Sequence, residues 1–194
     1  MLNNQTKTAD IGHQGFTLIE VITALTIIMV GIIGAFQLVN QSLATSNTTS
    51  MQLTAAYLGK EGFEIVRNIR DDNYLKYLFS EGDDGYENLD TAWMNGLASN
   101  GSPYSRDCSA GCGADYTMRQ LETGWAGQKL KHDGNFFNYT TGSPTLYQRI
   151  IKVTPKPSVA DTDYLNVSVK VIWSDRGKSR SIEIQENLYN TWPQ

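Results

Sequence analysis

Three residues near the N-terminus could do chemistry together, namely a flexible glycine, the residue after it, and a carboxylate inside an apolar segment. Gly15 directly precedes Phe16, and Glu20 follows about one helical turn later, inside an apolar run that reaches Val39. A carboxylate at the middle of a bilayer costs about 2.5–3.5 kcal/mol, and less near the interface, so it calls for a partner. Cleavage after Gly15, whose backbone offers a protease little hindrance, would place a new Phe16 ammonium at the depth of Glu20. The two charges could then pair within one subunit or between neighbours.

The apolar run from Phe16 to Val39 is long enough to cross a bilayer as a helix, which takes about 20 residues. It is longer than the apolar part of a cleaved secretory signal, and no small-residue cleavage site follows it. Lys7, Asp10 and the chain's amine precede the run, and the next charge is Lys60. This slight positive excess favours an N-terminus inside the cytoplasm and a downstream domain outside. A plain single-pass anchor without processing is the simpler alternative.

The stretch "GFTLIEV", with the long apolar run behind it, resembles the N-terminal processing motif of type IV pilins and type II secretion pseudopilins. In this resemblance Gly15 is the last leader residue, Phe16 the first mature residue and Glu20 the fifth. The family implies cleavage by a membrane prepilin peptidase, N-methylation of Phe16, and assembly into a helical filament. The implied partners are that peptidase, other pilin or pseudopilin subunits, and the lipid of the bacterial inner membrane.

Two features depart from the family's usual pattern. The leader "MLNNQTKTADIGHQG" is poor in lysine and arginine, where family leaders are basic. The first proline of the chain is Pro103, whereas many major pilins carry a proline in the membrane helix. We therefore expect a straighter helix, and the segment resembles minor pilins and pseudopilins more than the abundant subunit.

Patterning divides the chain into a leader 1–15, a transmembrane segment 16–39, a helix continuation 40–72 and a globular head 73–194. Residues 40–52 are rich in Ser, Thr and Asn, which have low helix propensity, and a linker is one interpretation. Apolar residues then recur at steps of three and four from Ala55 to Ile69, which predicts a helix ending near Arg70. We expect one continuous helix through residues 40–52.

The C-terminal half shows the two-residue period of β-strands. Val167, Val169, Val171 and Trp173 fall on one face of a strand. The sequence predicts a turn at 175–177 and an antiparallel sheet of three to four strands, whose apolar face needs the helix as its cover. The predicted class is α+β, a long N-terminal helix packed on a small antiparallel sheet. The predicted strands are 135–139, 145–155, 165–173 and 180–189, and residues 74–115 are loop-like apart from a short helical turn.

Cys108 and Cys112 stand in the stretch "CSAGC". A disulfide is plausible if the head lies outside the cytoplasm, with free thiols as the alternative. The spacing does not fit the C-x-x-C redox motif.

Other polar groups suggest weaker possibilities. An acidic loop has the ligand type that calcium prefers but not EF-hand spacing, and solvation is the simpler interpretation. A basic turn could bind DNA or merely aid solubility, and one sequon could accept a glycan. The loop is Asp83, Asp84, Glu87 and Asp90; the turn is Arg176, Lys178 and Arg180; the sequon is Asn138-Tyr139-Thr140.

The net charge and the numbers of cysteines and histidines limit the possible classes of function further. The 194 residues carry a net charge of −4, two cysteines and two histidines, and these form no His/Cys cluster of the kind that a structural zinc site, with about four ligands, requires. No nucleophile–base–acid set is visible, so we expect no enzyme, no cofactor, no metal and no nucleic-acid partner. The hypothesis is a prepilin-like subunit of a type IV pilus or type II secretion pseudopilus. A monomeric anchored binding module, such as an adhesin or DNA-uptake receptor, and an anchored extracytoplasmic enzyme are the alternatives.

Overall fold

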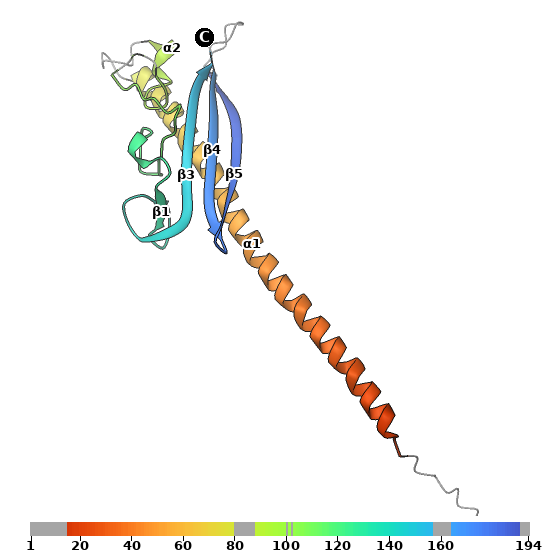
Figure 1. The fold of residues 1–194 in the computed structure, drawn as a ribbon. Helices are drawn as coiled ribbons and strands as arrows, with labels where there is room; N and C mark the ends of the chain where they lie inside the picture. Colours follow the sequence, from red (N-terminus) through yellow and green to blue (C-terminus); the bar gives the residue numbers. More distant parts are fainter. Residues whose placement is uncertain (1–14, 80–87, 100, 102, 157–163, 191–194) are drawn as a thin grey trace, which may run out of the picture. The chain divides into compact units, whose positions relative to one another are not determined.

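The computed structural model describes residues 15–79, 88–99, 101, 103–156 and 164–190. It contains one long helix, α1, and a five-stranded antiparallel sheet, which confirms the α+β class (Figure 1). The chain divides into two compact units, Met1–Asn47 and Thr48–Gln194. The five strands, and the part of α1 from Thr48 onward that packs on them, belong to the second unit, which is called the head below.

Helix α1 spans Leu18–Phe79 and passes through residues 40–52 without a break, so the continuous helix is confirmed. Hydroxyls in this weak stretch bond to the helix itself. Thr45 donates to the carbonyl of Gln41 at 3.0 Å, and Thr54, just beyond the stretch, donates to the carbonyl of Ser50 at 3.1 Å. Such bonds satisfy the hydroxyls but do not strengthen the helix, so the strongly helical segments on both sides must hold this stretch in the helix.

The predicted helix end near Arg70 was wrong, because α1 continues to Phe79. The added turns are held by tertiary bonds. Asn73 is 1% exposed, and its amide donates to the carbonyls of Trp93 at 3.2 Å and Asn95 at 2.7 Å. The hydroxyl of Tyr74 bonds to Asn190 at 2.6 Å. These partners are remote in sequence, so local stop signals did not decide the end.

The sheet has the strand order β2-β1-β3-β4-β5, with every neighbouring pair antiparallel. It has one strand more than the three to four expected. The additional strand, β1, was missed because only Leu130 of its four residues is buried, too short a pattern to show a period. The strands are β1 Lys129–His132, β2 Phe137–Asn138, β3 Ser143–Lys156, β4 Tyr164–Asp175 and β5 Lys178–Tyr189; the short helices are α2 Leu89–Ala92 and η1 Thr123–Trp125.

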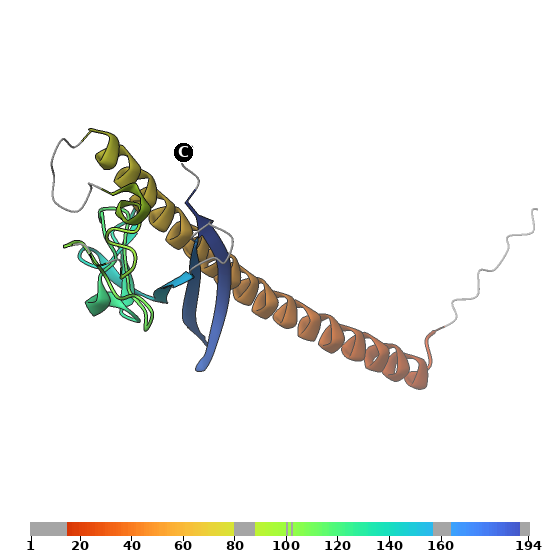
Figure 2. The same ribbon diagram turned by 90° about the horizontal axis from the view of Figure 1, so that it is seen from above.

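Within the head, the second half of α1 lies along one face of the sheet, as Figures 1 and 2 show from two directions. Thr48 contacts Asp175 at the end of β4, and Arg67, farther along the helix, pairs with Glu186 near the end of β5. Strand β5 therefore runs in the same direction as α1. The β4–β5 turn lies beside Thr48, at the start of the head's share of the helix.

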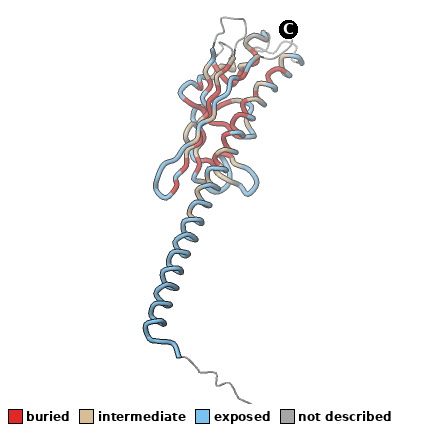
Figure 3. Tube along the Cα trace, turned by 90° about the vertical axis from the view of Figure 1, so that its right-hand side faces the viewer, coloured by how far each residue is buried: buried red, intermediate tan, exposed pale blue. Residues whose placement is uncertain are grey.

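The core lies between this part of α1 and the sheet, and burial is concentrated there (Figure 3). Gly62 lets the two layers approach closely, because a Cβ on it would lie 2.8 Å from Cγ1 of Val169. The guanidinium of Arg149 is fully buried in the same layer, bonded to helix and loop. The largest buried apolar side chains are Trp93, Leu58, Leu97, Leu121, Leu130, Ile151 and Leu165.

Candidate functional site

The N-terminal segment has a defined helix start. Residues 15–17 are not helical, and Thr17 caps the helix that begins at Leu18. Its carbonyl accepts the backbone N–H groups of Glu20 at 3.1 Å and Val21 at 3.2 Å, and its hydroxyl oxygen accepts Glu20 N–H at 3.3 Å. The spacing T-x-x-E is typical of a capping box. Thr17 is a site residue that the sequence reasoning missed, and this spacing is the signal that would have found it.

The structure places Gly15, Phe16 and Glu20 close together along the chain around that cap. A Cβ on Gly15 would meet no atom within 4 Å, and Phe16 is 82% exposed, so the bond between them is open to a protease. Glu20 lies in the first turn of α1, where the helix dipole favours a negative charge. Within the described part of the chain, no cation pairs with the Glu20 carboxylate.

The two threonines that follow Glu20 bond to carbonyls of the helix itself. Thr23 donates to the Glu20 carbonyl at 3.0 Å, and Thr26 donates to the Ile22 carbonyl at 2.6 Å. In lipid, such groups need internal partners. The most apolar window of α1 has a mean hydropathy of 2.4 with none of its residues buried, and α1 is long and apolar enough to cross a membrane. Glu20 is thus the one ionisable side chain of the apolar run, and it is available for pairing.

Residues 12–36 match the family model of the prokaryotic N-terminal methylation motif. The match includes Gly15, Phe16, Glu20 and most of the apolar run, and it supports the relationship with type IV pilins and pseudopilins. The head lies outside the matched residues. No match to the chain is found among curated proteins or among solved structures.

The predicted disulfide is present between Cys108 and Cys112, whose Cα atoms lie 5.2 Å apart. Both cysteines are buried, and the segment between them lies along the edge of β3. Cys112 exchanges two backbone hydrogen bonds with Ile151, at 2.7 and 2.8 Å, and the carbonyl of Cys108 accepts Val153 N–H at 3.2 Å. The disulfide segment therefore covers a stretch of strand edge that would otherwise present unpaired groups.

The sequon residue Asn138 is not a free glycan acceptor in this fold. It is 2% exposed, and its side-chain oxygen Oδ1 accepts the backbone N–H groups of Thr140 at 3.0 Å and Thr141 at 2.7 Å. Its amide donates to Asp133 at 3.3 Å. Backbone N–H groups of Phe136 and residue 135 bond to that carboxylate and lower the pKa of Asp133. Asp133 thus shapes the β1–β2 turn, and Asn138 shapes the turn before β3.

The structure describes the basic cluster of the sequence but not the side chains of the acidic one. Asp83, Asp84 and Glu87 lie outside the described residues, as does the side chain of Asp90, so a calcium site stays untested. The basic residues Arg176, Lys178 and Arg180 are exposed on the β4–β5 turn. Arg176 adopts a left-handed φ of 51°, and the neighbouring Gly177 supplies the second left-handed residue that such a two-residue hairpin requires.

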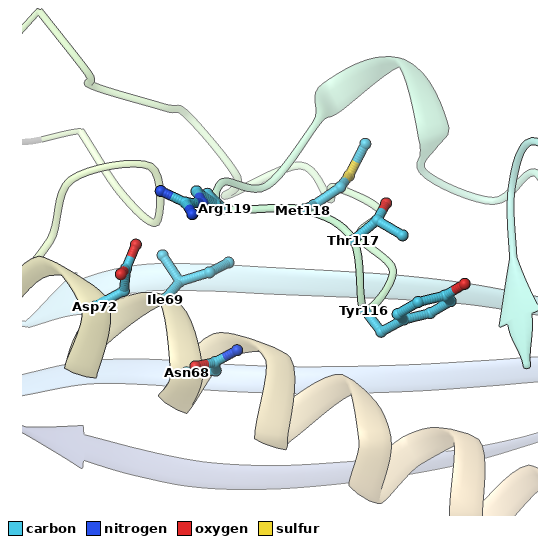
Figure 4. A pocket seen from close by; sticks show the side chains of 7 residues that line it. All are labelled: Asn68, Ile69, Asp72, Tyr116, Thr117, Met118 and Arg119. Atoms are coloured by element: carbon cyan, nitrogen blue, oxygen red, sulfur yellow. The ribbon is translucent and has the colours of Figure 1, made fainter.

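A shallow groove lies between α1 and the loop 115–119 (Figure 4). The hydroxyl of Thr117 is already engaged, since it donates to Asp115 at 2.6 Å. The lining combines one carboxylate and one amide from the helix with an arginine and an aromatic ring from the loop. It is lined by Asn68, Ile69, Asp72, Tyr116, Thr117, Met118 and Arg119. His132 is half-buried in β1 and stacks edge-on with Phe137.

Proposed function

We propose that the chain is a structural subunit of a type IV pilus or a type II secretion pseudopilus, made as a prepilin. A membrane prepilin peptidase cleaves after Gly15, and Phe16 is then N-methylated. The apolar part of α1 holds the subunit in the cytoplasmic membrane with its N-terminus inside and its head outside. Assembly proceeds through that helix, with other pilin or pseudopilin subunits as partners.

One observation carries the proposal: a wholly exposed apolar helix has its single carboxylate, Glu20, about one turn after an accessible Gly15–Phe16 bond. Lipid would cover the apolar surface of a lone subunit, and neighbouring helices would cover it in a filament. In either setting the carboxylate needs a cation. The ammonium that cleavage creates on Phe16 lies at the right depth, and pairing between subunits would fix their axial register.

The first experiment determines the mature N-terminus. The protein is isolated from membranes of its native host and analysed by intact-mass spectrometry and N-terminal sequencing. We expect a chain that begins at Phe16 and carries one added methyl group. A mature chain that retains residues 1–15 would contradict the processing.

The second experiment separates insertion from assembly. Glu20→Ala removes the carboxylate, whereas the control Glu64→Ala removes an exposed carboxylate outside the apolar run. We expect both variants in the membrane fraction, but only the control in sheared filaments and in crosslinks through residues 16–39. Normal filaments with Glu20→Ala would refute the pairing. Insertion without subunit crosslinks in the unmodified chain would instead favour a monomeric anchored binding module.

A further inference from the structure

The β4–β5 turn presents an unbalanced positive charge. Arg176, Lys178 and Arg180 are exposed, while the nearby Asp175 points inward and is 5% exposed. Its carboxylate accepts hydrogen bonds from the Thr48 hydroxyl at 3.2 Å and from Nε of Arg180 at 3.0 Å. Within the described chain, Arg176 and Lys178 have no carboxylate partner.

The same end of the head carries two further cations. Lys129 and Lys131 stand on β1, and Lys131 pairs in register with Pro144 at the start of β3. Because β3 and β4 are antiparallel, the start of β3 lies beside the end of β4, where the turn begins. Asp133 is an exposed carboxylate on this side whose hydrogen bonds from backbone N–H groups leave its charge in place, so it offsets only one of these cations. A chain with a net charge of −4 thus has a cationic end.

This end is tied closely to the apolar run, because the turn contacts Thr48. The helical stretch from Val39 to Thr48 rises only about 14 Å, and its residues could not span more than about 32 Å even if fully extended. The headgroup layer on each side of a bilayer takes up about 5–7 Å. The Debye length is about 8 Å at physiological ionic strength. The short tether therefore allows the long basic side chains of this turn to reach the lipid surface of an inserted subunit.

We propose that the β4–β5 turn of the inserted subunit binds anionic phospholipid headgroups of the membrane leaflet that faces the head. The inference rests on the membrane insertion in the proposed function. The tether supplies the specificity: it holds the cations at the lipid surface at a high effective concentration, whereas DNA would have to be recruited from solution. The contact would hold the head of an unassembled subunit against the membrane, and extraction into a filament would break it.

The test uses the full-length chain in lipid nanodiscs, with a donor fluorophore on Ser179→Cys in the turn and an acceptor on a trace of labelled headgroup. One set of discs contains phosphatidylcholine alone, and the other contains phosphatidylcholine with about one-third phosphatidylglycerol. The charge variant is Arg176→Gln/Lys178→Gln. The matched control is Lys152→Gln/Lys156→Gln, which removes two exposed cations from β3.

We expect higher energy transfer in the anionic discs for the unmodified turn and for the control variant. Each basic residue near an anionic surface raises the equilibrium constant for binding to that surface about fivefold. The Arg176→Gln/Lys178→Gln variant should therefore lower the ratio of surface-bound to free heads about 25-fold, and added salt should do the same. Energy transfer that is the same in both sets of discs would overturn the proposal. So would energy transfer that only added duplex DNA changes, in discs of phosphatidylcholine alone. Co-flotation of each variant with lipid checks insertion, so that a failure of the proposed function is recognised separately.

Discussion

Arg149 is the residue whose replacement should disturb the head most. Its guanidinium is fully buried on β3 and reaches three acceptors: the Leu58 carbonyl at 3.2 Å, the Ala114 carbonyl at 2.5 Å and the Glu61 carboxylate at 3.1 Å. It thereby joins the sheet to α1 and to the loop after the disulfide. Arg149→Met keeps most of the apolar stem but removes the charge and all of these bonds.

The magnitude follows from what each change leaves behind. Arg149→Met leaves the buried carbonyl of Ala114 without its donor, which costs about 1–3 kcal/mol, and removes two further bonds worth about 1 kcal/mol each, so we expect a loss of about 3–5 kcal/mol. The Glu61 carboxylate that this change leaves unpaired is 32% exposed and can be solvated. Glu61→Gln instead leaves the buried guanidinium without a carboxylate, but two carbonyls and a neutral acceptor still bind it, so we expect a loss of about 2–3 kcal/mol, less than for a buried charge left without partners.

Urea unfolding of the full-length chain in nonionic detergent measures these free energies, with the fluorescence of the buried Trp93 and Trp173 as the probe. The two single variants and the double variant complete a mutant cycle. We expect the combined loss to be smaller than the sum, because the carboxylate has no buried partner to lose once Arg149 is gone. An Arg149→Met protein as stable as the parent, or more stable, would show that desolvation of the arginine outweighs its bonds and would refute the reasoning.

Three further predictions concern the head. Gly62→Ala should destabilise it by about 1–3 kcal/mol through overpacking against β4, whereas Gly59→Ala, whose Cβ would meet only the flexible end of one isoleucine, should be close to neutral; urea midpoints compare the two, and equal losses would contradict the packing argument. Replacing both Cys108 and Cys112 by serine opens a five-residue loop, for which the entropic model gives about 2 kcal/mol, and hydrogen exchange should rise along the adjacent edge of β3; unchanged exchange there would count against edge protection. The pKa of Asp133 is lowered by backbone N–H groups, so its contribution to stability is complete above its ordinary value of 3.8 and is lost as the pH falls through the lowered one; NMR titration locates that pKa, and Asp133→Asn should flatten the acid side of the stability curve.

Local patterns predicted much of the fold because they need only neighbouring residues. The two-residue period of Val167, Val169 and Val171 places a strand whatever covers it. The three-and-four spacing from Ala55 to Ile69 likewise predicts the helix that packs on the sheet. Strand β1 was not predicted, because four residues with one buried side chain are too few to show a two-residue period. The end of α1 escaped because the bonds of Asn73 are made with residues remote in the chain.

The residues of the candidate site, too, could be predicted where the pattern is local. Gly15, Phe16 and Glu20 are recognisable from order and spacing, since all of them lie in one short continuous segment. The cap at Thr17 was also visible in the spacing, although its hydrogen bonds required coordinates. The position of the basic turn could not be predicted, because it depends on the antiparallel register of β4 with β5 and on their packing against Thr48.

The sequence by itself determined that this chain has a membrane-length apolar helix with a carboxylate about one turn after the Gly15–Phe16 bond, because both are properties of a short, continuous segment. Only the tertiary structure decided where that helix ends, which strand edge the disulfide covers, how Arg149 is neutralised and which end of the head is cationic. Each of these depends on groups distant in the chain that meet only after the helix has packed on the sheet.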